Sequence, residues 1–153
     1  MAYATLDDVQ RRMPQFQLTA TSKPSTEPAQ VFLDDTHAQF DSAMENLGYV
    51  VPITGERALA QCKEIVCQGT IAKILYARAA AVGTDVAVHS ADRAQRQYDD
   101  SLKNLANEAS PIDLKDAVRT SDEMAKTGVG PMGLTVDDNG DAITARATMD
   151  QNF

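Results

Sequence analysis

The chain has 153 residues, with 14 Lys and Arg against 22 Asp and Glu, for a formal net charge of −8. A chain of this length can bury the core of one domain. The acidic balance argues against a surface that binds nucleic-acid phosphates or anionic lipid, because both need clustered Lys and Arg. It is compatible with passive contact to DNA, since an acidic surface keeps DNA from adhering.

The composition changes along the chain. Residues 1–114 are rich in Ala and helical patterns, whereas residues 115–153 are polar, acidic and interrupted by Gly. The second part has too few large apolar residues to form a core of its own. We therefore predict an all-α fold, with a small four- to five-helix bundle over residues 1–114. An extended C-terminal arm containing a β-hairpin is expected over residues 115–153.

The first two helices are predicted from capping signals and an apolar stripe. Thr5 is expected to cap a short helix that Pro14 stops. The second helix is expected to open at Ser25-Thr-Glu-Pro28 and to end near Gly48. Its buried face is predicted from apolar steps of three and four residues: Leu33, Thr36, Phe40, Met44 and Leu47.

The third helix is expected to be the core of the bundle. Thr54 is its predicted N-cap and Gly83 its predicted end. Its second half is apolar nearly all round, which is typical of a helix contacted on several sides. Gln68, Lys73 and Arg78 within it indicate a core helix and not a membrane span. The predicted buried side comprises Leu59, Cys62, Ile65, Val66, Gly69, Ala72, Leu75, Tyr76 and Ala79.

The fourth helix is expected to be capped by Ser90 or to begin slightly earlier, with one apolar stripe and one charged face. The stripe consists of Ala91, Ala94, Tyr98, Leu102, Leu105 and Ala109. Asp99 and Lys103 are spaced for an i,i+4 ion pair. A short fifth helix is expected after Ser110-Pro-Ile-Asp113.

Two sets of residues are candidates for contact with other subunits. The first lies on the charged face of the fourth helix: Arg93, Arg96, Asp99 and Asp100. A face that carries both signs can pair with a rotated copy of the molecule, although a solvated face would have the same composition. The second set lies in the arm and is expected to contact the portal or another partner: Leu134, Val136, Ile143, Met149 and Phe153.

The arm contains a strong hairpin signal. Residues 128–133 are rich in Gly, and Asn139-Gly140 follows between two alternating segments at 134–145. Since a lone two-stranded hairpin is only marginally stable in water, this hairpin is expected to need a partner surface.

Two acidic clusters resemble metal sites, and each has a simpler interpretation. Asp34, His37, Asp41 and Glu45 form a row that could ligate a metal, but the row also fits a solvated face opposite the apolar stripe. Residues 137–141 imitate the start of a calcium loop, but the Gly and Glu that complete such a loop are missing, which favours a β-turn.

The cysteines and the remaining motifs give no argument for an enzyme. Cys62 and Cys67 fall on different faces of one helix, so they are expected to be buried free thiols rather than a disulfide or metal ligands. No phosphate-binding loop or nucleophile motif is present in the sequence. We expect no catalytic residues, no cofactor and no bound metal.

Four segments in order carry a family resemblance: Tyr3–Arg12, Val31–Asp41, Gly48–Pro52 ahead of a long helix, and Asp92–Leu102. Over about residues 1–110, the chain resembles the head–tail connectors, or head-completion adaptors, of tailed bacteriophages with long tails. The resemblance implies a structural virion protein at the head–tail interface, assembled from the host cytoplasm. It implies a dodecameric ring beneath the portal protein. DNA would only pass through the channel, and a head-completion or tail protein would dock below.

Two alternatives from other classes are a helical regulator of the helix-turn-helix type and, more remotely, a metal-dependent enzyme that uses the Asp34 row. A regulator needs a basic recognition helix, whereas the fourth helix is balanced in charge. The size of the assembled particle separates a ring adaptor from a dimeric regulator.

Overall fold

Helices account for the regular structure in the part of the chain that the computed structural model describes, which comprises residues 2–105, 114 and 116–122. No strand is present within these ranges, so the predicted all-α class is confirmed there. The helices are α1 (Leu6–Arg12), α2 (Thr26–Asn46), α3 (Glu56–Val82) and α4 (Asp85–Leu105).

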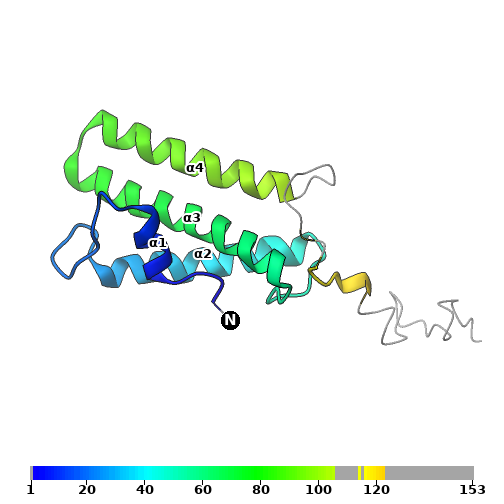
Figure 1. Ribbon diagram of the computed structural model, residues 1–153. Coiled ribbons are helices and arrows are strands. Elements are labelled where there is room, and N and C mark those ends of the chain that lie inside the picture. Colours follow the sequence, from blue (N-terminus) through cyan, green and yellow to red (C-terminus); the bar gives the residue numbers. More distant parts are fainter. Residues whose placement is uncertain (1, 106–113, 115, 123–153) are drawn as a thin grey trace, which may run out of the picture.

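Helix α3 lies at the centre of the molecule. It contacts α1, α2 and α4, and α4 returns antiparallel to it after the Gly83-Thr84 turn. Gly83 has a positive φ of 68°, a left-handed conformation that favours Gly at a helix end. Figure 1 shows α2 and α4 on either side of α3, with α1 near the α2 side. The prediction of a core helix is therefore confirmed.

The same arrangement explains the apolar composition of α3. By length and composition, α3 could cross a membrane. In the structure α3 packs against three neighbouring helices, and its buried residues lie on several sides of the helix. This is the packing expected for a central helix.

The apolar stripe of α2 is buried as predicted. Leu33, Thr36, Phe40 and Met44 are all inaccessible or nearly so, while Leu47 is half-buried. The hydroxyl of Thr36 donates to the Phe32 carbonyl over 2.7 Å, which satisfies this buried polar group within its own helix.

Gly69 lets α2 and α4 approach α3 closely. A β-carbon at this position would lie 2.7 Å from Cγ2 of Thr36 and 2.8 Å from Cε2 of Tyr98. Tyr98 on α4 is buried and thus fills the space that the missing side chain leaves. The stripe of α4 is buried at Ala91, Tyr98 and Leu105.

Three details of the helices differ from the predictions. Tyr76 was expected on the buried side of α3 but is exposed, because its hydroxyl reaches outward to Asp92 on α4 over 2.6 Å. Helix α4 begins at Asp85, five residues before Ser90. Lys103 pairs with Asp100 over 3.7 Å rather than with Asp99, because Asp99 accepts from Gln95.

The start of α3 differs as well. The N-cap is Gly55 rather than Thr54, and no side chain of the cap residue bonds to the helix. The carboxylate of Asp116 takes over this role. Its oxygens accept from the backbone nitrogens of Arg57 and Ala58 at 2.7 and 2.9 Å. A distant residue therefore satisfies the first amides of the helix.

Residues 116–122, the first described part of the predicted arm, lie against the connection between α2 and α3. The Val50 nitrogen donates to the Val118 carbonyl, and the Thr120 nitrogen donates to the Gly48 carbonyl. Leu114 is buried in the core just before this stretch. The chain thus contacts the helical body on both sides of the predicted boundary at residue 115. The fifth helix, predicted to run to about Arg119 or Lys126, lies mostly outside the described residues. Residues 116–119 are not helical, and residues 120–122 form a single short helical turn.

Candidate functional site

The N-terminal segment occupies the acidic row of α2. The Ala4 nitrogen donates to Nε2 of His37 over 3.2 Å, and the Tyr3 hydroxyl donates to Oδ1 of Asp41 over 2.5 Å. The Tyr3 ring also packs edge-on against Phe40, with ring centroids 5.3 Å apart. Two members of the row therefore bind this chain's own N-terminal segment.

The electrostatics of this contact favour the neutral forms of His37 and Tyr3. Burial lowers the pKa of His37, while Asp34 and Asp41 oppose the shift. Burial and the hydrogen bond to Asp41 raise the pKa of Tyr3. The Ile53 nitrogen donates to the Tyr3 hydroxyl over 3.0 Å. Tyr3 thus joins the N-terminal segment, α2 and the α2–α3 connection at one buried point.

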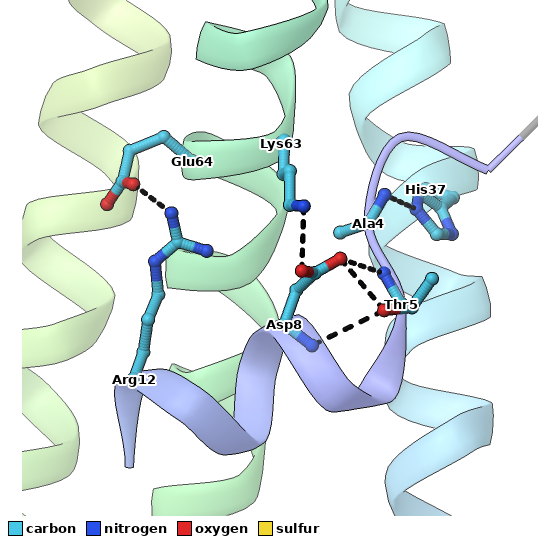
Figure 2. A network of polar contacts seen from close by, with 7 residues as sticks. All are labelled: Ala4, Thr5, Asp8, Arg12, His37, Lys63 and Glu64. Carbon is cyan, nitrogen blue, oxygen red and sulfur yellow. Dashed lines mark hydrogen bonds and ion pairs between the residues drawn. The ribbon is translucent and has the colours of Figure 1, made fainter. Parts of the chain in front are cut away.

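Helix α1 is held across α3 by polar contacts (Figure 2). Thr5 and Asp8 form a reciprocal capping box, as expected for an N-cap at Thr5. Lys63 on α3 reaches Oδ1 of Asp8 over 2.7 Å, and Arg12 pairs with Glu64. The contacts with Lys63 and Thr5 lower the pKa of Asp8 to about 2. This network has the structural role of docking α1.

Within the described ranges, no group of three or more His, Cys, Asp or Glu side chains could hold a metal ion. Cys62 and Cys67 are free and buried, as predicted. Burial raises the pKa of the Cys62 thiol to about 12 and also raises that of Cys67. Both thiols are therefore protonated and unreactive near neutral pH.

The candidate subunit contacts on α4 are brought together in part. Arg93, Arg96 and Asp100 are exposed and follow one another along one side of the helix. Asp99 is half-buried and accepts from Nε2 of Gln95 over 2.9 Å. Three of the four candidates thus form an accessible stripe with both charge signs, and Asp99 lies beside it. The predicted β-hairpin and residues 137–141 lie outside the described residues. So do the five candidates of the arm: Leu134, Val136, Ile143, Met149 and Phe153.

A second surface, which the sequence did not indicate, lies where α3 turns into α4. We call residues 75–90 the hairpin tip, after the helical hairpin of α3 and α4; the name does not refer to the predicted β-hairpin of the arm. Four of the five exposed large apolar side chains in the described part belong to it: Tyr76, Val82, Val86 and Val88. Val86 is 79% exposed and Val82 is 55% exposed. The fifth, Val31, belongs to the first half of α2, a helix that begins at the same end of the molecule (Figure 1).

The hairpin tip is nearly free of charge in an otherwise acidic chain. Only Arg78 and Asp85 are charged within it, one of each sign. In the sequence, Val86 and Val88 lie outside the apolar stripe of α4. This position is the one signal from which their exposure could have been predicted. An exposed apolar group without strong charge is typical of a protein-binding surface.

Comparisons with protein-family models, with curated proteins and with solved structures found no match to this chain.

Proposed function

We propose that the chain is a structural virion protein that forms a ring adaptor between the portal and the head-completion or tail proteins, and that it lines the DNA channel. The sequence resemblance to head–tail connectors suggested this role. The observation that carries the proposal is the pair of accessible surfaces on the α3–α4 hairpin. One is the mixed-charge stripe of α4, and the other is the apolar hairpin tip.

These two surfaces suit repeated contacts between copies. A ring is built from heterologous contacts, in which one patch of a subunit meets a different patch of the next. The stripe of Arg93, Arg96 and Asp100 carries both signs and can therefore pair with a rotated copy. Ion pairs in such a rim set orientation more than affinity. The apolar tip would add buried area at a separate point.

The charge of the chain suits a channel through which DNA passes. The net charge of −8 is multiplied in a ring, and basic residues are interleaved with acids along the chain. Tight binding to duplex DNA needs several phosphate contacts from Lys or Arg. A channel wall of this kind would therefore repel the DNA backbone and let DNA slide.

The C-terminal arm completes the proposal. The arm is proposed to carry its β-hairpin near residues 134–145 and to bind partners through its apolar residues, with the portal as one partner. Residues 116–122 fasten the start of the arm to the body through the Asp116 cap and the pairing with residues 48–50. An arm anchored in this way would start from a fixed point in every subunit of the ring.

The mass of the particle formed by the full chain tests the proposal. Native mass spectrometry over a range of protein concentrations should give one closed species with many copies, and a gel-shift assay should detect no tight complex with duplex DNA at physiological salt. A particle that stays dimeric at every concentration and shifts DNA would instead support the helix-turn-helix regulator and overturn the adaptor.

A further inference from the structure

The hairpin tip contains a hollow that can receive one large apolar side chain. Its volume is about 280 Å³, and Leu75, Val82, Val86 and Ala87 form much of its lining. The hollow lies between the end of α3 and the start of α4, where the exposed Val82 and Val86 are part of its lining. It is too small to hold a helix or a folded domain. Its shape therefore suits a short extended segment that inserts a single apolar residue.

A fixed cation borders this hollow. Arg78 contributes to its lining, and the Arg78 guanidinium lies 4.6 Å from the centroid of the Phe16 ring. This cation–π contact favours that position of the guanidinium. Among the residues that the structure describes, Arg78 takes part in none of the ion pairs. A segment with an apolar residue next to a carboxylate would therefore satisfy both the hollow and the cation.

The chain itself contains such a segment beyond its described part. Leu134-Thr-Val136-Asp137-Asp138 places an apolar residue directly before two acids. We propose that residues 134–138 of a second copy of this chain occupy the hairpin tip, with Val136 in the hollow and Asp137 or Asp138 paired with Arg78.

Reach favours a second copy over the same molecule. Residues 116–122 lie at the end of α3 where that helix begins, opposite the hairpin tip (Figure 1). Helix α3 rises about 33 Å between Glu56 and Arg78 at ~1.5 Å per residue. Val136 lies fourteen positions after Asp122, and a random coil of that length would span on average about 20 Å. Binding to its own tip would require the segment to be stretched beyond this average, although still within its fully extended length of about 46 Å, whereas the tip of a second copy imposes no such requirement.

The anchor of the donor segment at residues 116–122 and the acceptor tip lie at opposite ends of the body, so the proposed contact would be heterologous and could repeat from copy to copy. The inference rests on the self-assembly in the proposed function, and it assigns residues 134–138 to the neighbouring subunit. Ile143, Met149 and Phe153 remain available for the portal.

Photo-crosslinking in the full chain tests the inference. A benzoylphenylalanine at position 86 replaces Val86 in an equal mixture of ¹⁴N- and ¹⁵N-labelled protein, and mass spectrometry identifies the products. The expected result is a cross-link from position 86 to residues 134–138 in pairs that combine both isotopes. Cross-links only within one isotope would place the segment on its own molecule and overturn the proposal. Links to another hairpin tip, or no link to residues 134–138, would overturn it as well.

Charge reversal provides a second measurement in the same assay. Arg78→Glu should lower the yield of the mixed-isotope cross-link about two- to fivefold, the range for an exposed ion pair. Adding Asp137→Lys and Asp138→Lys should restore the yield, and Arg11→Glu, at an exposed position on α1 outside both proposed surfaces, serves as the matched control. A yield that is unchanged by Arg78→Glu would remove the ion pair from the proposal.

The outcome separates this inference from the proposed function. A closed ring that lacks the cross-link would leave the adaptor standing and overturn the inference. The cross-link in a particle that is not a closed ring would support the inference and overturn the adaptor.

Discussion

The carboxylate of Asp116 caps the first turn of α3, with its Oδ2 atom 2.7 Å from the backbone nitrogen of Arg57, 59 residues earlier in the chain. Gly55 makes this approach possible, because a β-carbon there would lie 2.4 Å from the Asp116 carbonyl oxygen. The central helix of the body and the start of the predicted arm are thus joined at one point.

Removal of this cap should destabilise the body. Asp116→Ala leaves the amides of Arg57 and Ala58 without the carboxylate, and the free energy of unfolding should fall by about 1–2 kcal/mol. Urea unfolding followed by circular dichroism measures the effect. Asp122→Ala, at an exposed position in the same stretch, is the matched control. Equal stabilities for the two variants would mean that the cap contributes nothing.

A methyl group at position 69 should be poorly tolerated. In an ordinary helix interior, Gly→Ala stabilises. In α3 the new β-carbon would meet Thr36 and Tyr98, so Gly69→Ala should cost about 1–3 kcal/mol. Thermal unfolding gives the value. The double variant with Thr36→Ser should recover part of the loss, and a Gly69→Ala protein as stable as the wild type would contradict the close approach.

The hydroxyl of Tyr3 should matter more than that of Tyr76. Tyr3→Phe leaves the Ile53 nitrogen and Asp41 without their partner at a buried point, which should cost about 1–3 kcal/mol. Tyr76→Phe removes an exposed contact with Asp92 and should cost much less. Chemical denaturation of both variants makes the comparison. The opposite ranking would show that the N-terminal segment is not firmly docked.

Acid should loosen the N-terminal segment through His37. Burial holds the pKa of folded His37 below its ordinary value of 6.5, and its Nε2 must be unprotonated to accept from Ala4. Below pH 6.5 the unfolded state therefore binds the proton first, so stability falls with pH until the folded pKa is reached. Wild-type protein should lose more stability than His37→Gln between pH 7 and pH 5. His89→Gln, at an exposed position on α4, should follow the wild type. Parallel curves for wild type and His37→Gln would refute this.

Charge reversal on α4 should block assembly while sparing the fold. Arg93→Glu with Arg96→Glu removes the positive half of the exposed stripe, so copies that rely on opposite charges would repel one another. The double variant should keep the wild-type circular dichroism spectrum but fail to form the multimeric species in native mass spectrometry. Arg11→Glu with Lys23→Glu makes the same change in net charge at exposed positions away from α4, and this control should assemble normally. Normal rings from the Arg93 and Arg96 variant would exclude this stripe from the interface.

Local sequence patterns were sufficient for the helices and most of the core. The periodic apolar residues of α2 and the apolar character of α3 predicted which sides are buried, because helix geometry places residues three and four apart on one face. Thr5 and Gly83 marked helix ends for similarly local reasons. The separation of Cys62 and Cys67 followed from the same geometry.

The tertiary structure decided the contacts between distant residues, which no local pattern encodes. Asp116 replaced Thr54 as the cap of α3 because the chain returns to that helix end. Two members of the acidic row of α2 turned inward to the N-terminal segment rather than toward solvent. Tyr76 and the valines of the hairpin tip are left exposed because no other part of the described chain covers them. Periodicity states which residues share a face, but only the packing of the other helices decides whether that face is covered.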